Sequence, residues 1–352
     1  MVKQNKHKYS TNKYIAFTDV ARLINIRLEE IPILYGSLGV EFRVKKDMKC
    51  RNINLMLSNE LISDKWESLV DLMSVAGFSL KSEKDRLFER EGMELTVSNT
   101  EELSAYAGID VHTFEKINDF AEFYLPKVCD FLEIYNYKSK DNKCVLALNE
   151  YVQNEVTKKV KRFARKNYDN DNYCKNYYRS LRIYNLATKI AKNEGLSSYV
   201  IGLSALLYYA KMNNIDFHQL LADNGVHQTL EKEINNIISC ASGKNAPKKS
   251  EAKCLYDALI IDKLGAVGIA EAFAHDAING ITMYNTEITP NSIETEKDYQ
   301  NYTYNTIDYF HTVLMQLESK VKTNHGKKLA KERTKFMQKF LYEFYDEWEG
   351  II

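Results

Sequence analysis

Two aspartates, Asp257 and Asp262, lie in an otherwise apolar stretch of the chain, residues 251–274. Its apolar residues recur at helical spacing, and Gly265 and Gly268 are small enough to let another backbone approach, so the stretch is predicted to form one central buried helix. Burying a carboxylate is costly unless a metal ion, an Arg or Lys, or backbone donors satisfy it. The two aspartates therefore each need a metal ion, a basic side chain or backbone donors as a partner.

A second set of polar residues lies in the N-terminal third. Gly36 and Ser37 end a predicted buried strand, Asn52 and Asn54 alternate on the next predicted strand, and Glu94 lies on a later one. This order resembles the nucleotidyltransferase fold, which has a Gly-Ser turn, then Asp-x-Asp, then a third acidic residue. Glu94 aligns with the third acid.

The resemblance implies a Gly-Ser backbone that holds a triphosphate and carboxylates that bind two divalent ions. Here Asn52 and Asn54 replace the Asp-x-Asp pair, and Asn lacks the charge that hard cations need. We therefore do not expect nucleotidyl transfer, although Gly36 and Ser37 could still bind a nucleotide. The alternative is that these two residues form an ordinary strand-to-loop turn.

The stretch 251–274 resembles the last conserved segment of the HD-domain metal-dependent phosphohydrolases, which places Asp257 at the position of that family's final metal ligand. In the same alignment Arg179 takes the position of the first histidine, and Tyr208 and Tyr209 replace the His-Asp doublet. The family's metal site would therefore keep Asp257 alone. A catalytic divalent ion needs imidazoles and carboxylates around an open position, so no metal or other cofactor is expected.

The cation at position 179 suggests how the metal would be replaced. A guanidinium of Arg179 close to Asp257 would neutralise that carboxylate as an internal ion pair. Among the histidines, His275 beside Asp276 follows the central stretch directly and is the one to examine. The histidines lack a metal-ligand spacing such as His-x-x-x-His.

Basic residues alternate with tyrosines between Tyr168 and Arg182, a range that includes Arg179. Such a surface could stack bases and contact phosphates. The alternative is a solvated helix face followed by tyrosines that cover a core.

The closing block, residues 326–348, has an apolar stripe that includes Phe336 and Trp348, with charges opposite. It resembles the last helix of the bacterial YpgQ/YedJ-type HD proteins, so the HD resemblance extends over roughly residues 150–350. We expect the block to be an amphipathic docking helix.

Composition excludes several classes of protein. Among 352 residues, 48 Lys and Arg balance 48 Asp and Glu, so no overall field indicates nucleic acid or membrane as a partner. The sequence has no apolar run of membrane-spanning length and no signal-peptide pattern. Its six scattered cysteines include no C-x-x-C pair, which indicates a reducing compartment. A cytoplasmic, largely helical protein is expected, and the resemblance to bacterial HD proteins implies a bacterial one.

The predicted fold class is α+β, with a small α/β nucleotidyltransferase-like domain and a larger all-α HD-like domain. The predicted parts are a disordered leader (1–12), the first domain (13–140), a linker (139–143), the HD-like domain (145–352) and, within that domain, a long loop (276–305). The predicted helices of the first domain are 14–30, 65–76 and an aromatic-rich segment at 119–137. Its predicted strands are 31–43 with the Gly-Ser turn, 52–57, 78–81, 86–89 and 93–97.

These patterns favour a pseudoenzyme that acts as a regulator by binding a nucleotide, a nucleic acid or a protein. One alternative is an active phosphohydrolase or nucleotidyltransferase that uses Asp257, Asp262, His275 or Glu94. Another is a structural subunit that pairs with an active paralogue. The expected partners are a nucleotide or nucleic acid, another protein, or a second copy of the chain. The residues expected to bind a nucleotide or nucleic acid are Gly36, Ser37, Asn52, Asn54, Arg179 and Arg182. No membrane partner is expected.

Overall fold

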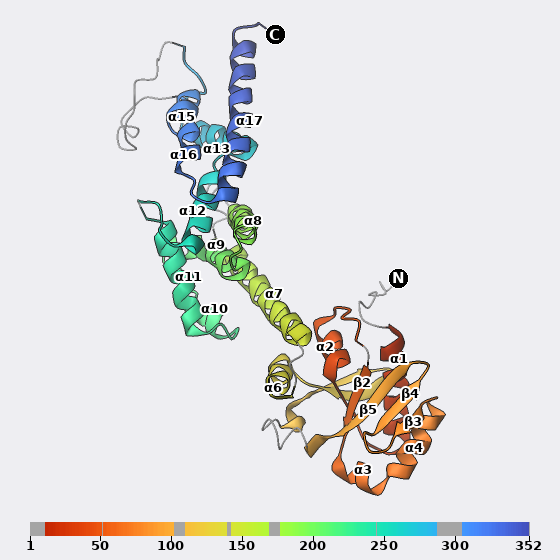
Figure 1. Ribbon diagram of the computed structural model, residues 1–352. Coiled ribbons are helices and arrows are strands. Elements are labelled where there is room, and N and C mark those ends of the chain that lie inside the picture. Colours follow the sequence, from red (N-terminus) through yellow and green to blue (C-terminus); the bar gives the residue numbers. More distant parts are fainter. Residues whose placement is uncertain are drawn as a thin grey trace. The chain divides into compact units, whose positions relative to one another are not determined.

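A computed structural model describes residues 11–50, 52–101, 110–138, 142–168, 177–243, 245–286 and 305–351. The chain divides into two compact units, Met1–Asn154 and Glu155–Ile352 (Figure 1). The first unit contains a seven-stranded sheet and the second is built from helices, so the predicted α+β class is confirmed. The division between the units falls within one long helix, α7 (Asn142–Asn167).

The first unit is organised around its mixed sheet, in the order β3-β4-β5-β2-β1-β7-β6. Parallel pairs join β2 to β5 and β1 to β7, and the other neighbours are antiparallel. The strands are β1 (Ile33–Tyr35), β2 (Asn52–Leu57), β3 (Ser79–Ser82), β4 (Leu87–Arg90), β5 (Met93–Asn99), β6 (Glu115–Asp119) and β7 (Ala121–Leu125).

Alternation along β2 separates a core face from a polar face. Ile53 and Leu55 are fully buried in the main core, whereas Asn52 and Asn54 point to the opposite face and are half-buried. Side chains of α1 (Thr11–Arg27) and α4 (Trp66–Val75) complete this core. The period of two in the sequence therefore leaves the asparagines on a sheet face that lies outside the main core.

Three predictions for the first unit need correction. The segment 119–137 is not one helix, because β7 contains buried Ala121, Phe123 and Leu125 in strict alternation before α6 (Val128–Lys138) begins. The aromatic residues of the segment made this alternation hard to recognise in the sequence. In the structure, residues 121–125 form a strand because they pair with β1.

The first predicted strand is also shorter than expected. It ends at Tyr35, and residues 36–44 form helix α2 (Gly36–Val44), so Gly36 and Ser37 open a helix. The predicted leader likewise ends earlier, because Thr11 and Asn12 belong to α1; residues 1–10 lie outside the described part of the chain, as does most of the predicted linker.

In the second unit, α9 (Ser198–Met212) is apolar around most of its circumference, and its residues 200–207 are buried against neighbouring helices. The other helices are α8 (Tyr177–Asn193), α10 (His218–Ala222), α11 (Gln228–Ala241), α12 (Ser250–Ile261), α13 (Gly265–Ile278), α15 (Thr306–Thr312), α16 (Leu317–Lys320) and α17 (Asn324–Trp348). No helix within the described residues has the length and apolar character needed to cross a bilayer.

The predicted central helix is in fact two helices. α12 ends at Ile261, and Gly265 opens α13 with a φ of +81°, a conformation that favours glycine. A Cβ atom on Gly268 would lie 2.0 Å from the carbonyl oxygen of Lys263. The small residues thus let the chain turn back on itself, and they place Asp262 at the break between the helices.

The closing helix α17 has a buried stripe that includes Ala330, Met337 and Leu341. Phe336 and Trp348, predicted to lie on this stripe, are 50% and 49% exposed, which corrects the prediction at both positions. Of the predicted loop at 276–305, Asp276–Ile278 belong to α13, and residues 287–304 lie outside the described part of the chain.

The break between α12 and α13 gives a stability prediction. Gly→Ala inside a helix normally stabilises, but Gly268→Ala should lower the free energy of unfolding by about 1–3 kcal/mol, because the methyl group meets a backbone atom that must move. Gly243→Ala is the control, since the atom nearest to a Cβ added at that position is 3.5 Å away. Urea unfolding of both variants measures the difference, and equal midpoints would contradict the close approach.

Candidate functional site

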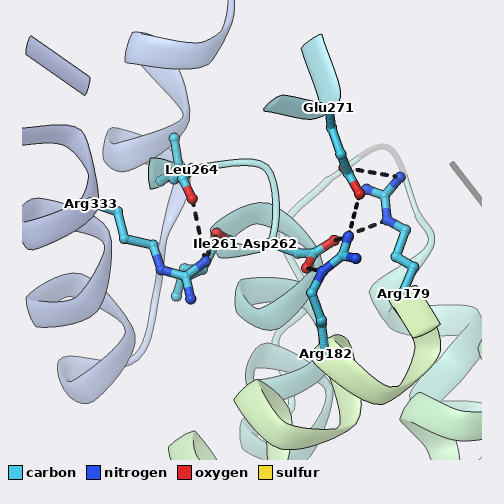
Figure 2. Close-up of polar contacts among 7 residues, drawn as sticks. All are labelled: Arg179, Arg182, Ile261, Asp262, Leu264, Glu271 and Arg333. Carbon is cyan, nitrogen blue, oxygen red and sulfur yellow. Dashed lines mark hydrogen bonds and ion pairs between the residues drawn. The ribbon is translucent and has the colours of Figure 1, made fainter. Parts of the chain in front are cut away.

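Four charged side chains meet beside the break in the second unit (Figure 2). Arg179 and Arg182 lie one turn apart on α8, Asp262 follows α12, and Glu271 lies on α13. The distance is 2.9 Å from Arg179 Nε to Asp262 Oδ2 and from Arg182 Nε to Asp262 Oδ1. Arg182 also pairs with Glu271, and Arg179 Nη1 is 3.7 Å from Glu271 Oε2.

Burial makes these contacts obligatory for Asp262. Its side chain is 1% exposed, and Arg179 is 12% exposed, so each charge has lost most of its water. Burial lowers the pKa of Arg182, but hydrogen bonding to Asp262 and the charges of Asp262 and Glu271 raise it further, to a net increase. Two cations therefore neutralise two carboxylates, and both oxygens of Asp262 are occupied.

A third arginine fixes the break from the other side. Arg333 of α17 donates from Nη1 to the carbonyl oxygens of Ile261, at 2.6 Å, and Leu264, at 3.3 Å. Figure 2 shows it on the side of the break away from the four charges. Arg333 thus adds hydrogen bonds to a carbonyl group at the end of α12 and to one at the N-cap of α13.

Tyr208 and Tyr209 of α9 lie in the electrostatic environment of Arg179. Burial raises the pKa of both phenols, and the charge of Arg179 opposes the increase. The rings of the two tyrosines are 5.2 Å apart, and Tyr209 also packs edge-on against Tyr168. Both side chains are therefore neutral phenols near pH 7 and lack the charge of a carboxylate ligand.

The expected ion pair between Arg179 and Asp257 is wrong. Asp257 is fully buried and accepts hydrogen bonds from the backbone N–H of Lys322, at 2.9 Å, and from the N–H and hydroxyl of Thr323, both at 2.6 Å. Thr323 is the N-cap of α17, so the carboxylate ties α12 to the start of the closing helix. Sequence spacing could not reveal this, because the donors lie more than sixty residues away.

A divalent metal ion does not fit these residues. The position expected for a ligand histidine carries Arg179, whose cation already pairs with Asp262, and the oxygens of Asp257 accept four hydrogen bonds. Within the described ranges, no group of three or more His, Cys, Asp or Glu side chains could hold a metal. The arginines provide the positive charge locally.

His275 lies on α13, where its Nδ1 is 2.8 Å from Oδ1 of the buried Asp276. The pair belongs to the same helix as Glu271. It orients the ring of His275, and it is not one of the four side chains of the ion cluster.

The N-terminal candidates come together on the polar face of the sheet. In the strand register Asn52 lies opposite Glu94, and Asn54 lies opposite Tyr35. Gly36 is held close to Asn54, since a Cβ on Gly36 would lie 2.4 Å from its Nδ2. With Ser37 in the first turn of α2, the structure gathers the predicted set at one end of β1.

Sequence reasoning missed Glu271, Arg333 and Ser98. Ser98 Oγ is 2.6 Å from Tyr35 Oη on the polar sheet face, and Glu271 completes the ion cluster. The signal for Glu271 was available, since it is the only acidic residue between Asp262 and Asp276.

Much of the predicted basic and tyrosine-rich surface, residues 169–176, lies outside the described residues. Tyr178 is exposed, and Lys161 lies 4.2 Å above the ring of Tyr184. Arg179 and Arg182, assigned to this surface, instead point to carboxylates in the same unit.

Known proteins resemble parts of the chain, and no protein-family model matches it. Bacillus subtilis YnaI is 28% identical over 153 residues, which cover 40% of this chain and 98% of YnaI. YpgQ from the same organism is 26% identical over 185 residues, which cover 48% of this chain and 82% of YpgQ.

Solved structures give a similar result. An HD-superfamily hydrolase from Bacillus thuringiensis is 24% identical with a TM-score of 0.46, and the alignment covers 57% of this chain and 98% of that one. The similarity to YpgQ agrees with the predicted HD resemblance. The nucleotidyltransferase resemblance of the first unit stays a prediction.

Because the ion cluster is buried, removing one of its charges should strongly lower the free energy of unfolding. Asp262→Asn should destabilise the protein by about 3 kcal/mol, because Arg179 and Arg182 would then share only Glu271. The matched control is Glu155→Gln, which removes a carboxylate from an exposed pair with Lys158 and should cost less than about 0.5 kcal/mol. Chemical unfolding compares the two, and similar losses would contradict the role given to burial.

Asp257 predicts a pH-dependent effect. Burial raises the pKa of Asp257 above 3.8, and the hydrogen bonds from Thr323 and Lys322 oppose this increase. The group therefore contributes most stability below the unfolded-state pKa, and this contribution is lost as the pH rises through the folded-state pKa.

Asp257→Asn should cost about 2 kcal/mol at pH 4, because an amide offers one acceptor oxygen to the donors of Lys322 and Thr323. The cost should become smaller as the pH rises toward 7, since only the wild type loses stability there. Unfolding curves of both proteins over this interval test the sign, and a cost that grows with pH would contradict it.

Proposed function

We propose that this chain is a catalytically degenerate protein that works by binding, with nucleotide phosphates as its ligand. The resemblance to HD-superfamily hydrolases implies that the second unit derives from enzymes that hydrolyse phosphate esters with a bound metal ion. In our proposal the second unit keeps that scaffold without its metal, and the first unit provides the binding site.

One observation carries the proposal: both oxygens of Asp262 are engaged by guanidinium groups, from Arg179 and Arg182. Arg179 also occupies the position of the family's first histidine by sequence. A hydrolase of this type needs a cation with an open coordination position for substrate or water. A guanidinium has no such position, so this cluster supplies charge and rigidity without metal chemistry.

The polar face of the first unit supports the choice of ligand. Gly36 and Ser37 begin α2, whose free N–H groups favour anions. Asn52 and Asn54 bring uncharged hydrogen-bonding groups to the same place. Glu94 contributes a negative charge beside Asn52, and the carboxylate of its neighbour Glu89 pairs with Lys81. This combination favours a nucleotide bound without two metal ions.

The relative YpgQ has been crystallised with ADP, which makes ADP the first nucleotide to test. Isothermal titration calorimetry of the full chain with ADP and ATP, in EDTA and in Mg²⁺, should give saturable binding that does not require the metal. Product analysis in the same solutions should detect no hydrolysis, and elemental analysis of the purified protein should find no stoichiometric divalent ion.

Gly36→Ala should abolish this binding, because its methyl group would displace Asn54 and disturb the start of α2. The matched control is Gly92→Ala, at a similar positive φ in the same unit but with no atom within 4 Å of the added Cβ. Equal affinity of both variants for the nucleotide would show that the binding site does not include Gly36.

Hydrolysis with a stoichiometric metal would instead favour an active enzyme that uses substitute residues. Absence of nucleotide binding, together with a co-purifying homologous subunit, would favour the structural-subunit alternative. Either result contradicts the proposed function.

A further inference from the structure

The closing helix α17 carries its charges in two blocks. The half up to residue 339 has exposed Lys327, Lys328, Lys331, Lys335 and Lys339, with Glu332 as the acidic exception. The half from residue 340 to the C-cap has Glu343, Asp346, Glu347 and Glu349 and no Lys or Arg. One helix is therefore basic at its start and acidic at its end.

This order is unfavourable for the helix itself. The helix dipole places partial positive charge at the N-terminus and partial negative charge at the C-terminus, so it favours acidic residues first and basic residues last. α17 has no acidic residue in its first turn and no basic residue in its last turn. Since helix stability does not explain the two blocks, they require another reason.

The blocks lie on the side of α17 that is turned away from its own unit. Helical spacing places Lys335, Lys339, Tyr342 and Asp346 opposite the buried stripe of Ala330, Met337 and Leu341. Lys331 and Glu349 lie at the edge of this outer face. Tyr342 is 72% exposed and lies where the basic block meets the acidic block. Figure 1 shows the C-terminal half of α17 extending beyond α13 and α15.

We propose that this face of α17 binds the same face of a second copy of the chain, with the two helices antiparallel. A two-fold axis between residues 340 and 341 would set Lys335 opposite Asp346 of the second copy, and it would bring Lys331 within one residue of the level of Glu349. Lys339 would then lie opposite Tyr342, whose ring can accept a cation. A self-complementary charge pattern of this kind is what a two-fold interface requires.

The chemistry sets the strength of this association. Exposed ion pairs each stabilise a complex only weakly and are screened by salt. The face carries one aromatic side chain at its centre and charges on either side. The dimer should therefore be weak and should dissociate as the salt concentration rises.

Sedimentation velocity of the full chain, over a wide range of protein concentration at low and high salt, tests the proposal. The wild type should dimerise at low salt. An all-acidic variant (Lys331→Glu, Lys335→Glu, Lys339→Glu) and an all-basic variant (Glu343→Lys, Asp346→Lys, Glu349→Lys) should each dimerise at least about tenfold more weakly, because like charges then face each other. An equimolar mixture of the two variants should form a heterodimer.

The control reverses three exposed charges elsewhere, Lys159→Glu, Arg162→Glu and Lys166→Glu on α7, and should leave the dimer unchanged. Thermal melting of each variant confirms that it is folded. A wild type that stays monomeric at low salt, a dimer insensitive to the reversals, or failure of the mixture to associate would overturn the proposal. A monomer whose lysine block instead binds an oligonucleotide would overturn it too.

Discussion

A carboxylate buried among helices cannot remain charged without partners, and this constraint shapes the second unit around Asp262. The carboxylate lies at a break that Gly265 and Gly268 permit, and Arg179 and Arg182 reach it from α8. Arg333 holds the other side of the same break through carbonyl groups. Because these charges are satisfied inside the protein, two arginines and two carboxylates form a neutral cluster that joins α8, the end of α12 and α13.

The two buried aspartates illustrate how differently the same side chain can be satisfied. Asp262 has cations as partners, whereas Asp257 accepts hydrogen bonds from Lys322 and Thr323 at the start of α17. Both oxygens of each carboxylate already have donors within the same unit. Both aspartates thus act on the position of helices, and α17 depends on both α12 and the break that follows it.

Two further features lie outside the ion cluster: the polar face of the sheet in the first unit and the outer face of α17. On the polar sheet face, Asn52 and Asn54 present uncharged amides beside Glu94 and Tyr35. On α17 the charge is plentiful but separated into two blocks that the helix dipole disfavours.

The amino-acid sequence by itself determined the α+β class, most helices and strands, and the alternation that puts Asn52 and Asn54 on one face, because these follow from local periodicity. It also indicated that Asp257 and Asp262 need partners. Only the tertiary structure decided which partners they have, that 121–125 is a strand beside β1, and that Glu271 and Arg333 join the junction. The physical reason is the same in each case: these contacts join segments far apart in the chain, and no local pattern encodes the distance between them.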